Sequence, residues 1–138
     1  MAISQTLCSS FKLELLEAVH NFTTDTFKIA LYTASASLGA STTVYTSSGE
    51  VVATGYTAGG QNLTGVMVNL TGTTAWVDFN DVTWTSPSLT ARGALIYNAS
   101  KGNKAVAVLD FGSDKTTTTT FTVQMPTPDA SSALIRIA

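Results

Sequence analysis

The sequence predicts an all-β protein with one short helix near its start. Short apolar runs alternate with clusters of Gly, Ser, Thr, Asn and Pro, which is typical of strands joined by turns. Threonine is the commonest residue, and β-branched residues favour strands over helices. About eight strands follow the helical segment, as in a sandwich or barrel. We expect one domain over 1–138, with an N-terminal arm and helix over 1–22 and the sandwich over 23–138.

Residues 91–111 are expected to form the central hairpin of this fold. Two apolar runs, 91–98 and 104–111, flank a short loop that contains Gly102 and Asn103. Gly and Asn tolerate the positive φ angles that a tight reversal needs. Both runs are almost continuously apolar, which is typical of strands that are covered on both faces.

The pattern in residues 11–19 predicts a short helix capped by Ser9 or Ser10. Phe11, Leu15, Ala18 and Val19 share one face, and Leu16 flanks it. A helix of three turns or fewer does not persist alone in water. It must therefore dock, either on the end of its own sandwich, which we favour, or on a neighbouring subunit.

The first clear strand is predicted over 26–33, with alternate apolar residues on one face. Residues 34–49 are small and polar and predict a long loop with a brief strand at 43–45. Residues 50–53 fit either a short strand or a helical turn. The glycine-rich segment 54–60 lacks the Gly-Lys-Ser/Thr that a phosphate-binding loop requires, so a surface loop is expected.

Strands are also predicted through the second half of the chain. Alternation over 61–70 places Leu63, Val66, Val68 and Leu70 inward. Residues 75–84 continue the pattern with a shift of period near Asn80, which indicates a bulge or turn, and Pro87 closes this segment. The five threonines 116–120 are expected to form a turn that leads into a strand at 120–125. A last strand is expected at 133–138.

Composition and charge exclude several classes of partner. Only 12% of the residues are charged, about half the usual share, and the net charge is −2. A weakly acidic chain does not attract nucleic acid or an anionic membrane, and no apolar run has the length of a membrane span. The start lacks the pattern of a secretion signal, and the single cysteine, Cys8, fits synthesis in a reducing cytoplasm. The low charge indicates either surfaces that pack against other proteins or a surface that is merely rich in Thr and Ser.

The sequence offers little for catalysis or cofactor binding. His20 is the only histidine and has no nucleophile beside it in any motif, and Cys8 has no Cys or His partner. Asp78, Asn80 and Asp81, with Asp110 and Asp114, could supply oxygen ligands to calcium, but no complete calcium loop is present. We therefore expect no enzyme and no catalytic, cofactor-binding or metal-binding residues.

Five segments resemble a family of small virion structural proteins of tailed bacteriophages. They are residues 9–16 (SSFKLELL), 25–33 (DTFKIALYT), 91–98 (ARGALIYN) and 121–126 (FTVQMP) with 133–137 (ALIRI). The similarity to capsid decoration or cement proteins implies a β-sandwich of jelly-roll type. It also implies a homo-oligomer, a dimer or trimer, made in the host cytoplasm and bound to the major capsid protein on the outside of the virion head. Such proteins have no catalytic residues.

Contact with the capsid is expected from the arm and helix, 3–19, and from the loop 34–60, because both are apolar or small without an evident place in the sandwich. The residues expected to make that contact are Ile3, Leu7, Phe11, Leu15, Leu38, Val44, Tyr45 and Tyr56. The alternative is a tail or neck component, or a fibre-tip adhesin. An adhesin could stack host carbohydrate on Trp76, Trp84 and Tyr97, because aromatic faces bind sugars.

Overall fold

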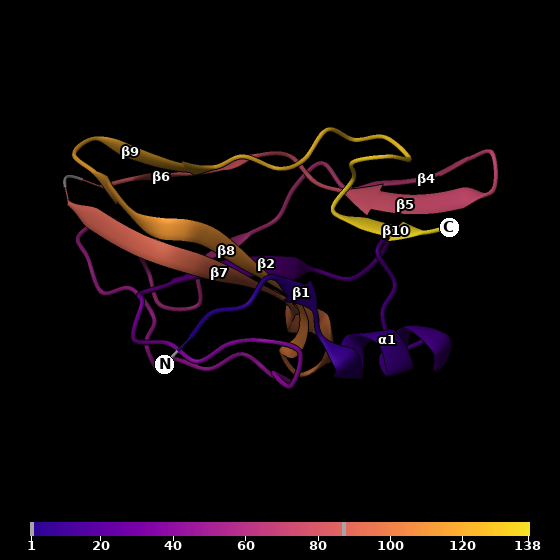
Figure 1. The fold of residues 1–138 in the computed structure, drawn as a ribbon, viewed down its shortest axis with the longest axis horizontal. Coiled ribbons are helices and arrows are strands. Elements are labelled where there is room, and N and C mark those ends of the chain that lie inside the picture. The colour runs from indigo at the N-terminus through magenta and orange to yellow at the C-terminus, as the bar shows by residue number, and fades with distance from the viewer. Residues whose placement is uncertain (1, 87) are drawn as a thin grey trace.

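The regular structure of the chain consists almost entirely of antiparallel sheets. The computed structural model describes residues 2–86 and 88–138, and 43% of the chain lies in strands, with one short α-helix (Figure 1). The predicted all-β class is therefore confirmed. Pro87, expected to close a strand segment, lies outside the described residues.

A five-stranded sheet forms the main layer, in the order β1-β8-β7-β2-β3. Its strands are β1 (Thr6–Leu7), β2 (Phe27–Tyr32), β3 (Gln61–Asn62), β7 (Leu89–Asn98) and β8 (Lys104–Thr117). A 3-10 turn, η1 (Ala99–Lys101), joins β7 to β8, and Gly102 and Asn103 after it have positive φ angles. The predicted central hairpin is therefore confirmed, with Gly and Asn at its reversal.

Two smaller sheets accompany the main sheet: in Figure 1, β6 and β9 run above β7 and β8, and β4, β5 and β10 lie to the right of β2. One has the order β10-β5-β4 and the other pairs β6 with β9. Their strands are β4 (Met67–Thr71), β5 (Thr74–Asp78), β6 (Val82–Thr85), β9 (Thr120–Val123) and β10 (Ile135–Ile137). The predicted strand 61–70 is thus divided between two sheets, because the chain turns at Gly65, where φ is +62°.

The β7–β8 hairpin is longer than predicted and contains a large bulge. Ala91 pairs with Lys115 and Gly93 pairs with Asp110, so the single residue Arg92 lies opposite four residues of β8. Arg92 Nε donates to Asp110 Oδ1 at 3.0 Å, and the N–H of Gly112 donates to the same oxygen at 2.9 Å. These two contacts fix the bulge. The threonine run beyond it belongs mostly to strands, so the predicted turn is confined to residues 118–119.

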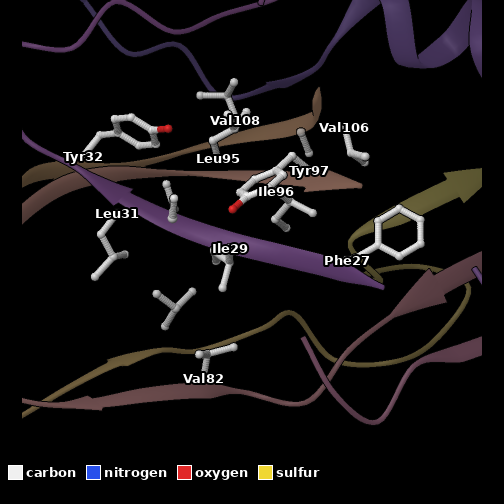
Figure 2. Packing of buried hydrophobic residues seen from close by; sticks show 14 of the residues in the cluster. Phe27, Ile29, Leu31, Tyr32, Val82, Leu95, Ile96, Tyr97, Val106 and Val108 are labelled. Carbon is white, nitrogen blue, oxygen red and sulfur yellow. The ribbon is translucent and has the colours of Figure 1, made fainter. Parts of the chain in front are cut away.

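Both faces of the main sheet are buried, as its apolar runs predict. Figure 2 shows Ile29 and Leu31 pointing from β2 toward Val82 of β6, with Tyr32 on the opposite face of the sheet. Ile29, Leu31 and Tyr32 have no exposed surface. The N-terminal arm and the loop 34–60 cover the second face, so the core has more layers than a single sheet pair.

The helix differs from its prediction at both ends. α1 (Ser9–Leu16) begins two residues early, and its N-cap is Cys8, without a side-chain cap from Ser9 or Ser10. It ends at Leu16 because Ala18 has a φ of +60°, outside the helical region. Phe11 is buried, as expected, whereas Leu16 is exposed. The helix packs on β8 of its own chain, the favoured of the two docking alternatives.

The loop 34–60 contains no regular strand, but three isolated bridges attach it to the fold. Leu38 pairs with Ile3, Val44 with Lys104, and Glu50 with Tyr32. The brief strand predicted at 43–45 is reduced to one of these bridges. Residues 50–53 form neither a strand nor a helical turn beyond the single bridge at Glu50.

Candidate interaction surface

Most of the side chains predicted to contact a capsid belong to the chain's own core. Ile3, Phe11 and Leu38 are buried, and Leu7, Leu15, Tyr45 and Tyr56 are partly buried against the same core. Only Val44 is exposed, at 47%. The reason for the prediction was wrong: the arm and the loop pair with each other through Ile3 and Leu38, and so have a place in the fold.

The aromatic platform proposed for sugar binding does not exist as a surface. Trp76, Trp84 and Tyr97 are 7%, 2% and 2% exposed. Trp76 lies on β5, Trp84 on β6 between Tyr56 and Phe121, and Tyr97 on β7 beside Tyr45. Three buried rings in separate parts of the core cannot stack on a carbohydrate, so this part of the alternative is wrong.

A buried carboxylate organises the loop 34–60. Glu50 is 8% exposed and accepts hydrogen bonds from the hydroxyls of Tyr45 and Tyr56, each at 2.6 Å, and from the N–H of Gly59 at 2.8 Å. Tyr97 donates to the carbonyl of Gly59 at 2.6 Å. Burial raises the pKa values of these three tyrosines and of Tyr32, and the negative charge of Glu50 raises them further. Protonated hydroxyls suit donation to the carboxylate, so this network ties the loop to the sheet.

The single histidine is also part of an internal network. His20 Nε2 lies 2.9 Å from Glu14 Oε1 on α1, and its Nδ1 lies 3.0 Å from Asn98 Nδ2 on β7. Asn98 Nδ2 also donates to Asp25 Oδ2 at 2.8 Å, so this nitrogen carries the hydrogens and His20 Nδ1 must accept. His20 therefore donates from Nε2 to Glu14. Both ring nitrogens are engaged, and the histidine connects the helix to the sheet.

Few nucleophilic groups are available for chemistry. Cys8 has no exposed surface, and burial, together with the charge of Glu14, raises the pKa of its thiol to about 11. Such a thiol is almost entirely protonated near neutral pH. Among the described residues, no group of three or more His, Cys, Asp and Glu side chains is arranged to hold a metal ion. Asp78 is fully buried on β5, and burial raises its pKa, whereas Asp110 serves the β8 bulge.

The most conspicuous exposed surface is apolar and lies on the three-stranded sheet. Val66, Val68, Leu70 and Ile137 are 39%, 48%, 70% and 54% exposed; we call them the β4 face. Val68 and Leu70 pair with Val77 and Ala75 of β5, and Ile137 also pairs with Ala75, so these side chains share one side of the sheet. The alternation in the sequence found this face but predicted it to be inward. Val77 and Ile135 do reach the core, whereas the outer part of the sheet extends past it.

A second apolar surface lies on α1. Leu13 is 59% exposed and Leu16 is 88% exposed, on the side away from the buried Phe11. The helix is therefore apolar on both sides, with Phe11 and Leu15 on the inner face as periodicity predicts and Leu13 and Leu16 outside. Leu13 and Leu16 were not among the predicted contact residues, although the prediction placed contacts on this helix.

A groove of about 520 Å³ runs between β8 and β9. Leu109, Phe111, Phe121 and Met125 form its apolar wall, and Lys115 is its one charged residue. Thr116, Thr117, Thr120 and Thr122 supply hydroxyl groups to its lining.

Comparisons of this chain with protein-family models, with curated protein sequences and with solved structures find no match. Within residues 2–86 and 88–138, no helix is long and apolar enough to cross a membrane.

Proposed function

We propose that this protein is a structural component of a tailed-phage virion, a decoration or cement protein that binds the outer capsid surface and stabilises the head. The observation that carries this proposal is the combination of exposed apolar side chains on the β4 face and α1 with internally engaged polar groups. Glu50 and His20, residue types that often serve as general acids or bases, hold segments of this chain together. The resemblance of five segments to phage virion proteins is the reason for proposing a phage particle as its location.

A low-charge surface suits this role. Only 12% of the residues are charged, so contact with a neighbouring protein requires little desolvation of charge. A contact through a few leucines is weak when it is made once. Repeated by an oligomer over a lattice, it gains from effective concentration. Binding of copies to the shell and to each other would therefore be stronger together than either alone.

The remaining features belong to the same proposal. They are a sandwich of jelly-roll type, a dimer or trimer of this chain, the major capsid protein as partner, location in the virion and no catalytic activity. The packing of several antiparallel sheets around one core is compatible with a sandwich. In this proposal the exposed Leu13 and Leu16, rather than the buried residues of the arm, contact the partner.

The copy number of this chain in purified particles, relative to the major capsid subunit, is the first test. A ratio near one, or a simple fraction of it, supports decoration. A ratio of a few per cent would assign the protein to the tail, the neck or a fibre instead. A chain that is missing from the particle would contradict the proposal as a whole.

Binding of purified protein to particles that lack it tests the helix surface. We expect Leu13→Ser with Leu16→Ser to lower the affinity at least about tenfold, because both leucines would lose their apolar contact. Val52→Ser provides the comparison, since Val52 is 98% exposed on the loop 34–60, the other segment expected to make the contact. A leucine variant that binds as tightly as the wild type would exclude α1 as the contact. Deletion of the arm is unsuitable, because Ile3 and Cys8 are buried in the fold.

A further inference from the structure

β4 is an edge strand without the features that usually prevent edge-to-edge pairing. It pairs with β5 on one side only. Proteins protect such edges with charged residues, proline, bulges or very short strands. The segment 65–77 has no charged residue and no proline, and the five pairs between β4 and β5 are in regular register. Val68 and Leu70 are exposed on the same strand.

Other strand edges of the fold are either protected against pairing or would bury less apolar surface if they paired. β1 and β3 have two residues each, β10 carries Arg136, and β8 is bulged opposite Arg92. β9 also has a free edge, but its apolar side chains Phe121 and Val123 are already buried. Pairing at β9 would therefore bury little additional apolar surface.

The hairpin register shows which backbone groups of β4 are free. Thr71 and Thr74 flank the two-residue turn at Gly72 and Thr73, so they form the hydrogen-bonded pair that closes the hairpin. Hydrogen-bonded and non-hydrogen-bonded pairs alternate along an antiparallel ladder. The N–H and C=O groups of Val68 and Leu70 therefore point away from β5, toward the open edge.

We propose that β4 pairs antiparallel with β4 of a second copy of this chain, around a two-fold axis at Asn69. In this register, Val68 of each copy faces Leu70 of the other. Because the N–H and C=O of both residues point outward, the two pairs form four backbone hydrogen bonds. The result is a continuous six-stranded sheet in which the exposed Val68 and Leu70 side chains pack across the axis.

We assign a second copy of this chain, rather than another protein, to the β4 edge because the edge is complementary to itself in three respects. Outward donors and acceptors coincide in the register, no like charges oppose each other, and apolar side chains meet apolar side chains. A stable interface buries about 800 Å² per partner. That area is a large share of the 6896 Å² surface of this chain. Pairing of a single strand buries less than 800 Å² per partner. The dimer is therefore weak and reversible in solution, and it does not depend on the proposed role in a virion.

Disulfide trapping tests the register directly. In Asn69→Cys, the two thiols lie on the axis in a non-hydrogen-bonded pair, with Cα atoms about 4.5 Å apart, within the range of a disulfide. Thr71→Cys is the matched control on the same strand and face, where the two cysteines are about 13 Å apart. Cys8 does not interfere, because it has no exposed surface. We expect mild oxidation to link Asn69→Cys into dimers much faster than Thr71→Cys, and equal rates would overturn the register.

Sedimentation of the purified chain between roughly 5 and 500 µM tests the association itself. We expect the sedimentation coefficient of the wild type to rise with concentration toward that of a dimer. Val68→Pro should weaken the association at least about tenfold, because proline removes an outward N–H that the β5 ladder does not use. Val68→Ala keeps the N–H and is expected to weaken it less. Near-UV circular dichroism of Trp76 and Trp84 verifies the fold of each variant. A wild-type chain that stays monomeric, or a dimer that Val68→Pro leaves intact, would overturn the proposal.

Discussion

The hydroxyl of Tyr56 donates a 2.6 Å hydrogen bond to Glu50 and accepts one of 2.9 Å from the N–H of Leu31 on β2. One phenol thus joins a loop carboxylate to the centre of the main sheet. Tyr45 and Gly59 donate to the same carboxylate, so three donors converge on Glu50. A carboxylate with three donors is satisfied without a cation, which explains how Glu50 can be buried.

Glu50→Gln should destabilise the fold. The amide carries two hydrogens, and one of them must face a hydroxyl or N–H that now donates to the carboxylate, so a buried donor loses its partner. We expect a loss of about 2 kcal/mol in the free energy of unfolding, measured by urea denaturation. Tyr32→Phe, which removes only the bond to the carbonyl of Thr46, is the control and should cost less. A variant as stable as the wild type would contradict the role given to this charge.

The protein should be more stable when the Asp78 carboxyl is protonated than when it is ionised. Its side chain has no exposed surface, and Oδ2 has no hydrogen-bond partner among the described residues. Burial, with contributions from Asp81 and Asp129, raises its pKa, so the folded state holds the proton more tightly than the unfolded state. Its ionisation therefore costs stability at neutral pH, and this cost disappears as the pH falls below the unfolded value.

We expect Asp78→Asn to raise the free energy of unfolding by about 1 kcal/mol at pH 7. Asparagine keeps an oxygen that can accept from the N–H of Phe79, as Asp78 Oδ1 does. The gain over the wild type should vanish below about pH 3, where the wild-type carboxyl is protonated in both states. The difference between the two proteins is the quantity to follow, because the lowered pKa of Asp25 makes both less stable in acid. A wild type that is more stable at pH 7 would contradict this reading.

Gly60 should tolerate no side chain. A Cβ at this position would lie 1.8 Å from the carbonyl oxygen of Ile29, in the backbone of a buried strand. Gly72 is the matched control, because its φ of +59° is also positive but a Cβ there meets nothing within 4 Å. We expect Gly60→Ala to cost at least about 3 kcal/mol and Gly72→Ala about 1 kcal/mol, measured by thermal unfolding. Equal losses would show that backbone strain alone decides both positions.

The thiol of Cys8 should react only when the fold opens. We expect alkylation by iodoacetamide at pH 8 to be at least about a hundredfold slower than in denaturant, because the thiol is buried and its pKa is raised to about 11. Mass spectrometry over time measures the rate. Fast labelling in the absence of denaturant would mean that the junction of β1 and α1 opens easily.

The central hairpin could be predicted because its pattern is local. Two apolar runs and a Gly–Asn reversal determine β7 and β8 without knowledge of any other segment. The bulge at Phe111–Asp114 could not be predicted, since it depends on Arg92 and Asp110 meeting across strands. The helix position was displaced for a similar reason, because Ala18 takes a positive φ that its residue type does not indicate.

The surfaces were harder to predict than the strands. Alternation placed Val68 and Leu70 on one face but could not show that the sheet extends beyond the core, which leaves both exposed. The loop 34–60 looked free because its residues are small and polar. Its attachment depends on Tyr56 accepting from the N–H of Leu31, and on Tyr32 and Tyr97 donating to the carbonyls of Thr46 and Gly59. These contacts join residues distant in sequence, and no periodic pattern records them.

The tyrosines and tryptophans of this chain report on different parts of the structure. All four tyrosines of the chain gather around Glu50 and the loop it holds, whereas Trp76 lies on β5 and Trp84 on β6. Among the ring pairs of the described residues, Tyr56 and Trp84 bring a tyrosine close to a tryptophan, with ring centroids 6.0 Å apart. Detachment of the loop would therefore change tyrosine absorbance and tyrosine-to-tryptophan energy transfer while the direct signal of Trp76 stays constant. Without any added label, the native chain reports the release of this loop separately from the unfolding of its sheets.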